Sequence, residues 1–103
     1  MKALCDQEGY LLDLSDWNRN VAEIIAEEVG IELSEAHWEL ILLVREFYQE
    51  YELSPSMRPL VKRVARKLGK EKGRSIYLLG LFPGNPAKSL AKIAGLPRPT
   101  NCI

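Results

Sequence analysis

Residues 35–51 have the sequence EAHWELILLVREFYQEY, the longest run in this chain with a helical spacing of apolar side chains. Ser34 stands directly before this run, where a serine caps the N-terminus of a helix. Residues 40–44 are all apolar, so apolar side chains occupy most of the circumference of the predicted helix. A helix of this kind is buried on more than one side. We therefore predict that residues 35–51 form the central helix of the domain.

Two shorter elements are predicted on the N-terminal side of the central helix. Residues 1–13 contain two short apolar runs around a glycine-containing turn, a pattern that indicates a β-hairpin. Ser15 or Asp16 is predicted to cap a helix that extends to Glu28. An isolated hairpin is only marginally stable, so we expect it to lie on the helices.

The C-terminal half is predicted to hold three further helices, at residues 58–68, about 74–81 and 86–94. Asn85 precedes the last of them as an N-cap and is followed by a proline, the residue type favoured at the first helical position. The predicted fold class is mainly α: a compact orthogonal bundle of about five helices with a small N-terminal β-hairpin.

Composition indicates one small globular domain, because 47% of the 103 residues are hydrophobic and 27% are charged. There is no apolar run near the roughly 18 residues of a membrane span and no cationic leader, so we expect a cytoplasmic protein without a membrane partner. In a reducing compartment a disulfide between Cys5 and Cys102 is not expected, and Cys5 is interpreted as a small buried hydrophobic residue.

His37 is the only histidine and lies in the first turn of the central helix. One histidine and two distant cysteines are a poor ligand set, so neither a metal nor another cofactor is predicted. A capping or packing role is expected for His37, with acid–base chemistry as the alternative.

Charge is divided unequally along this chain of zero net charge. Residues 1–52 hold 13 acidic and 3 basic side chains, whereas residues 53–103 hold 1 acidic and 11 basic ones. A polyanion or partner contact is predicted for the first part of this basic stripe, formed by Arg58, Lys62, Arg63, Arg66 and Lys67. The alternative is that the acidic helices lie across the stripe and neutralise it. An uncovered stripe would favour a helix-turn-helix nucleic-acid-binding protein.

The last residues are predicted to form an arm. Gly95 ends the last helix, and Pro97 and Pro99 prevent it from resuming and favour an extended path of about 3.1 Å per residue. We therefore divide the chain into a helical domain, residues 1–95, and a flexible arm, residues 96–103, that carries Cys102 roughly 20 Å from the body. The alternative is a cysteine that is merely tolerated at a frayed chain end.

Several separated motifs resemble the DsrC/TusE family. Residues 81–87 and 92–99, followed by the penultimate Cys102, are similar to the C-terminus of that family, and upstream matches occur at residues 9–11, 17–18, 37–39, 45–48 and 55–58. Members of the family that work with dissimilatory sulfite reductase carry a second cysteine eleven positions before the penultimate one, where this chain has Ala91. An intramolecular disulfide needs both thiols, so the chain resembles the single-cysteine relay branch instead. Asn85, inserted between glycine and proline, is a smaller departure.

The resemblance implies a sulfurtransferase without a cofactor, in which Cys102 carries a persulfide. In that branch the sulfur comes from a TusBCD-like donor complex and goes to an MnmA-like tRNA 2-thiouridylase, which thiolates the wobble uridine. Gly95, Pro97 and Pro99 would serve as hinge and spacer. Apart from the resemblance, the positive charge of Arg98 predicts support of the thiolate or persulfide anion. The alternative within the family is a DsrC-like regulatory or redox subunit of a sulfur-metabolism complex.

Overall fold

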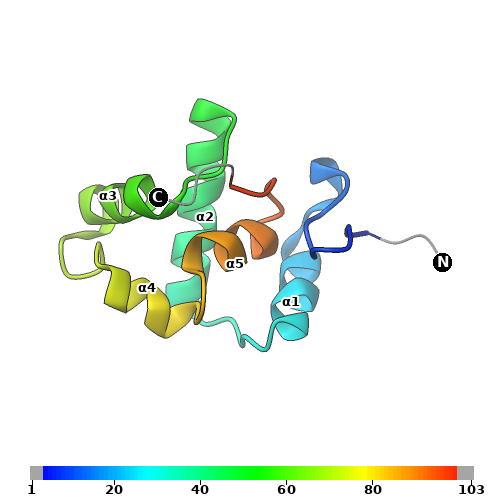
Figure 1. Ribbon diagram of the computed structural model, residues 1–103, viewed down its shortest axis with the longest axis horizontal. Coiled ribbons are helices and arrows are strands. Elements are labelled where there is room, and N and C mark those ends of the chain that lie inside the picture. The colour runs from blue at the N-terminus through cyan, green and yellow to red at the C-terminus, as the bar shows by residue number, and fades with distance from the viewer. Residues whose placement is uncertain (1–3, 100–103) are drawn as a thin grey trace.

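The computed structural model describes residues 4–99. Its elements are a short 3-10 helix and five α-helices: η1 (Leu14–Asp16), α1 (Arg19–Glu28), α2 (Glu35–Tyr51), α3 (Met57–Leu68), α4 (Ser75–Leu81) and α5 (Pro86–Ile93). The predicted mainly α fold with five helices is confirmed (Figure 1). None of these helices is long and apolar enough to span a membrane.

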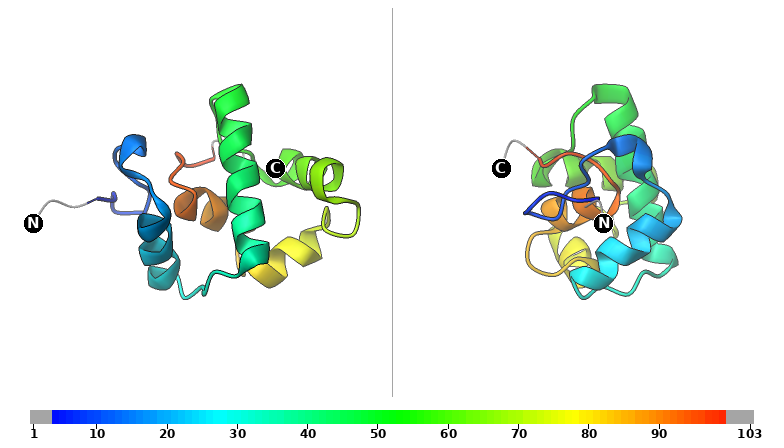
Figure 2. Two further views of the ribbon diagram at one scale, coloured as in Figure 1. Left: turned by 180° about the vertical axis from the view of Figure 1, so that it is seen from behind. Right: turned by 90° about the vertical axis from the view of Figure 1, so that its right-hand side faces the viewer.

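The centre of the molecule is α5 rather than α2. The short α5 packs against each of the other four α-helices, and Figure 2 shows it lying between α1 and α2. Leu90 and Ile93 of α5 are fully buried among Leu40 of α2, Leu60 of α3 and Leu78 of α4. The helix that carries the C-terminal segment is therefore held by contacts with all four of the other α-helices.

The predicted N-terminal β-hairpin is not confirmed, because residues 4–99 contain one isolated antiparallel bridge, between Cys5 and Leu11, and no strand. The Asp6 carboxylate accepts hydrogen bonds from the backbone N–H groups of Glu8 and Tyr10, at 2.9 and 3.0 Å. This side chain closes a tight loop, and the chain turns into η1 soon after the bridge, so a longer ladder does not form. Tyr10 and Leu11 are nevertheless buried, so the loop lies on the helices as expected.

α1 begins later than predicted. Ser15 and Asp16 belong to η1, and the side chain of Asn18 caps α1 by accepting from the Val21 N–H at 2.9 Å. Trp17, between the two helices, is held outside α1 by a hydrogen bond from its indole N–H to the carbonyl of Ile93, at 2.9 Å. A local cap at Asn18, which the sequence prediction passed over, and the distant contact of Trp17 together mark this boundary.

The predicted capping and packing role of His37 is confirmed. Its Nδ1 accepts from the backbone N–H of Ser34 at 3.1 Å, and its Nε2 lies 2.9 Å from the carbonyl oxygen of Leu81. The ring packs edge-on against Phe82, with centroids 5.1 Å apart. One buried side chain thus caps α2 and fastens it to the end of α4.

Replacement of His37 by alanine is expected to lower the free energy of unfolding by about 2–3 kcal/mol, because the Ser34 N–H and the partly buried Leu81 carbonyl both lose their partner. Urea unfolding followed by circular dichroism measures this loss. The exposed neighbour Glu35→Ala is the control and is expected to change stability by less than about 0.5 kcal/mol. Equal small effects at both positions would contradict the fastening role.

Candidate functional site at the base of the C-terminal arm

α5 ends in a tight capping motif at Gly95. The N–H of Gly95 donates to the carbonyl of Lys92 at 3.1 Å, and the N–H of Leu96 donates to the carbonyl of Ala91 at 2.9 Å. Gly95 has φ of +73°, a left-handed conformation that favours glycine. The predicted helix end at Gly95 is therefore confirmed. Ala91, where the redox members of the family have their second cysteine, is buried within α5.

The indole of Trp17 packs directly on Gly95. A Cβ atom added to Gly95 would lie 2.3 Å from Trp17 Cδ1, closer than any real contact of this kind. Glycine is therefore required here both for its backbone conformation and for the close approach of the ring. The Trp17 hydrogen bond to Ile93 holds the ring in this place.

Arg45 of α2 completes the packing around the end of α5. Its guanidinium lies 3.9 Å from the centroid of the Trp17 ring, and one of its nitrogens donates to the carbonyl of Ala94 at 2.6 Å. Burial lowers the pKa of Arg45. The stacked cation and the charge-assisted hydrogen bond together offset the negative, C-terminal end of the helix dipole, which is buried.

Ser54 holds the chain beyond α5. Its hydroxyl donates to the carbonyl of Pro97 at 2.5 Å, and both Leu96 and Pro99 are buried. We call Trp17, Arg45 and Ser54 the clasp, because each donates a hydrogen bond to a backbone carbonyl between Ile93 and Pro97.

The clasp shortens the free tether that the sequence predicts. Residues 96–99 pack against the body, so only three steps of chain separate Pro99 from Cys102. Three extended residues span about 10 Å, whereas the predicted reach of roughly 20 Å counts the whole segment from Leu96. The longer reach requires that Leu96 leaves its buried position and that the hydrogen bond from Ser54 to Pro97 breaks. Cys102 itself, the predicted persulfide residue, lies outside the described residues.

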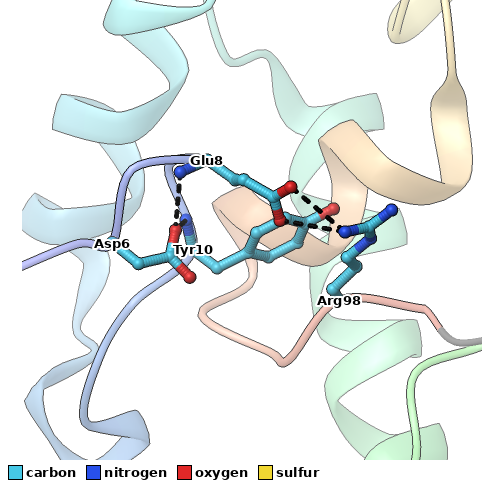
Figure 3. Close-up of polar contacts among 4 residues, drawn as sticks. All are labelled: Asp6, Glu8, Tyr10 and Arg98. Atoms are coloured by element: carbon cyan, nitrogen blue, oxygen red, sulfur yellow. Dashed lines mark hydrogen bonds and ion pairs between the residues drawn. The ribbon is translucent and has the colours of Figure 1, made fainter.

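Arg98 forms an ion pair with Glu8 of the N-terminal loop, with both carboxylate oxygens 3.1 Å from one guanidinium nitrogen (Figure 3). Both side chains are more than half exposed, so the pair stabilises the protein by at most about 1 kcal/mol. A weak pair of this kind can exchange partners. Support of a sulfur anion by Arg98 stays a prediction.

The basic stripe is partly neutralised by α2. Arg63 is buried and pairs with Glu50 at 2.6 Å, and Lys67 pairs with Glu46 at 3.3 Å. The other three members of the predicted contact set form no ion pair within the part of the chain that the structure describes: Arg58, Lys62 and Arg66. These three exposed cations are the part of the predicted contact set that is free for a partner.

The Glu50–Arg63 pair predicts a pH dependence of stability. The hydrogen bond from Arg63 is the main cause that holds the pKa of Glu50 below its ordinary value of 4.5. A carboxylate whose pKa is lower in the folded than in the unfolded protein contributes stability that is present above pH 4.5. This stability is lost as the pH falls through the pKa of the folded state. Glu50→Gln is therefore expected to lower the unfolding free energy at neutral pH and to change it much less in acid. Urea unfolding at both pH values tests this, and an equal loss at the two would count against it.

The clasp residues were not among the predicted site residues. Arg45 is the one basic residue between residues 20 and 57, and this isolation within an acidic and apolar segment was one available signal. Trp17 and Arg45 also lie in segments that match the family, at residues 17–18 and 45–48, which was a second signal. Ser54 carries neither signal, because only the folded chain brings it to the segment beyond α5. Within residues 4–99 no cluster of three side chains suited to bind a metal ion occurs.

The fold and the site define a small helical protein in which a C-terminal segment is fastened across the end of a central helix. A family profile described as DsrC like protein matches residues 1–103, so the chain belongs to the DsrC-like family. Its relatives include "Sulfurtransferase TusE homolog" of Haemophilus influenzae and "Sulfurtransferase TusE" of Escherichia coli, each 54% identical over 95% of this chain and 90% of the relative. The predicted family and the predicted sulfurtransferase role are confirmed.

Solved structures agree with this assignment. DsrC of Allochromatium vinosum, determined by NMR, is 50% identical with a TM-score of 0.88, covering 96% of this chain and 88% of that one. The oxidized gamma-subunit of the dissimilatory sulfite reductase of Archaeoglobus fulgidus is 36% identical with a TM-score of 0.84, covering 96% of this chain and 90% of that one.

Proposed function

We propose that this chain is a persulfide carrier in which Cys102 accepts a sulfur atom and passes it toward 2-thiolation of the tRNA wobble uridine. The observation that supports this most strongly is the 54% identity with sulfurtransferases over 95% of the chain. The clasp adds a physical reason, because it fixes the starting point of the segment that leads to Cys102. A sulfur carrier needs an accessible thiol at a defined place rather than a deep pocket.

The transfer is an exchange of one sulfur between thiols. The thiolate of Cys102 attacks the terminal sulfur of a donor persulfide, a new S–S bond forms on Cys102, and the S–S bond of the donor breaks. The electron pair of the broken bond leaves with the donor sulfur as a thiolate, and the proton of the terminal sulfur stays on the new Cys102 persulfide. Delivery repeats the step with an acceptor thiolate as nucleophile. Each step is balanced without an added oxidant or reductant.

The single cysteine near the C-terminus determines what happens after loading. Members with a second cysteine can resolve the persulfide within the molecule, but Ala91 supplies no thiol. The sulfur on Cys102 is therefore transferred only to another protein. We propose a TusBCD-like complex as donor and an MnmA-like tRNA 2-thiouridylase as acceptor, all in the cytoplasm.

The clasp sets the geometry of delivery. Trp17 and Arg45 keep the base of the arm fixed, while the single hydrogen bond from Ser54 and the exposed Arg98–Glu8 pair are weaker restraints further along. We propose that partners compete for these weaker restraints and so lengthen the tether when they bind. A positively charged partner site then lowers the pKa of the Cys102 thiol.

Mass spectrometry of the full chain after incubation with a cysteine desulfurase and cysteine tests this function. The intact protein is expected to gain one sulfur atom, which peptide mapping places on the fragment that contains Cys102. A thiol reductant should remove it. No gain, or a gain on the fragment with Cys5 alone, would contradict the carrier function.

A further inference from the structure

Two buried side-chain polar atoms have no hydrogen-bond partner within residues 4–99: Nε of Arg63, whose guanidinium already pairs with Glu50, and the hydroxyl of Tyr10. Tyr10 is 4% exposed, and its hydroxyl forms no hydrogen bond with any residue in 4–99. A buried hydroxyl without a partner destabilises the folded protein, so such groups are rare and need an explanation, of which a bound ligand is one. Figure 3 shows the ring beneath the Glu8–Arg98 pair, with its hydroxyl end directed toward the guanidinium.

Three cations line the cleft to which Tyr10 belongs. Tyr10 lines a cleft of about 290 Å³ together with Glu8, Lys88, Lys92 and Arg98. The ammonium of Lys92 lies 5.4 Å from the centroid of the tyrosine ring. With three cations and one carboxylate, the cleft carries a formal charge of +2.

The cleft is built from three distant parts of the chain. The N-terminal loop supplies Glu8 and Tyr10, α5 supplies Lys88 and Lys92, and the arm supplies Arg98. Burial raises the pKa of Tyr10, and this outweighs the opposite influence of Arg98, so the hydroxyl keeps its proton and can donate. Four donor side chains therefore face one small space, and Glu8 is the single acceptor among them.

We propose that this cleft binds a phosphate group, which replaces Glu8 on Arg98 and accepts a hydrogen bond from the Tyr10 hydroxyl. Arg98 can bind phosphate through two parallel hydrogen bonds, and Lys88 and Lys92 supply further charge. A phosphate presents more acceptor oxygens than the two of a carboxylate, and so it matches the four donors better than Glu8 does. The exposed Glu8–Arg98 pair is weak enough to be displaced.

The position of the cleft suggests the source of the phosphate. Arg98 precedes Cys102 by four residues, so the two Cα atoms are at most about 14 Å apart. A phosphate bound by Arg98 is thus held close to the sulfur that is transferred. This step rests on the proposed function: the phosphate belongs to the backbone of the RNA that receives the sulfur.

Two NMR titrations of the full-length protein test the proposal. One uses inorganic phosphate and the other uses an anticodon stem-loop RNA. Tyr10→Phe removes only the hydroxyl and is expected to weaken phosphate binding about tenfold. Because that hydroxyl has no hydrogen-bond partner within residues 4–99, the same variant is expected to unfold at the same or a higher urea concentration. Arg98→Gln should weaken RNA binding and reduce its salt slope by about one. Arg19→Gln, which removes a charge outside the cleft, is the matched control. It should change neither phosphate binding nor RNA binding.

The outcomes separate the sources of the phosphate. Binding of both probes, with the losses above, supports an RNA phosphate, and binding of inorganic phosphate alone supports the cleft with free phosphate as its ligand. Binding that Tyr10→Phe leaves unchanged, or competition by an acidic peptide but not by phosphate, overturns the proposal. Sulfur loading measured on the same variants keeps the two proposals distinct: loading without phosphate binding overturns only the cleft, and phosphate binding without loading contradicts only the carrier function.

Discussion

Cys102→Ser is expected to abolish sulfur loading completely, whereas Cys5→Ser is expected to leave it intact. A serine hydroxyl is not ionised at neutral pH and cannot form a persulfide. Cys5 is half-buried in the N-terminal loop, and burial, followed by the charges of Glu28 and Asp6, raises the pKa of its thiol. The Cys5 thiol therefore stays protonated at neutral pH and is a poor nucleophile.

Intact-mass measurement of both variants after desulfurase treatment tests this expectation. In cells that lack the native protein, Cys102→Ser should also fail to restore 2-thiolation of the wobble uridine, while Cys5→Ser should restore it. A sulfur adduct that survives in Cys102→Ser would show that another residue carries the sulfur. Loss of loading in Cys5→Ser, with the fold intact by circular dichroism, would also contradict the assignment.

Gly95→Ala is expected to destabilise the protein strongly, by about 3 kcal/mol. The left-handed backbone conformation alone costs a side chain about 1–2 kcal/mol. The new Cβ would also lie 2.3 Å from Trp17 Cδ1, and relief of such overpacking costs about 1–3 kcal/mol. Because Trp17 stacks under Arg45, displacement of the ring disturbs the whole clasp.

Two other glycines separate the contributions. Gly30 has φ of +77° and open space around a new Cβ, so Gly30→Ala should show the backbone cost alone, about 1 kcal/mol. Gly80 lies within α4 without a positive φ and with the same open space, so Gly80→Ala should stabilise the protein by about 0.5–1 kcal/mol. Urea unfolding of the three variants gives the ranking. A loss for Gly95→Ala no larger than that for Gly30→Ala would show that Trp17 does not press on the backbone.

Local chemistry was enough to predict most helices and the place where the last one stops. Asn85 before a proline predicted the start of α5, and Gly95 predicted its end, because caps act within a few residues. The same reasoning was wrong for the start of α1, where Asn18 caps the helix in place of Ser15 or Asp16 and a distant contact holds Trp17 outside it. The N-terminal loop differs from a hairpin because one side chain, Asp6, takes over two of its backbone donors.

The order of residues along the chain was sufficient for the start and end of α5, the charge asymmetry and the family resemblance, and it carries the prediction that Cys102 is the sulfur-carrying residue. The place of α5 at the centre, the clasp on its last carbonyls, and the cleft around Tyr10 came only from the folded molecule. The physical reason is separation in sequence: Trp17, Arg45 and Ser54 lie 43–76 residues from the carbonyls they hold. Short-range propensities carry no information about which distant backbone oxygen will accept a hydrogen bond from a side chain. Packing of the core determines that partner.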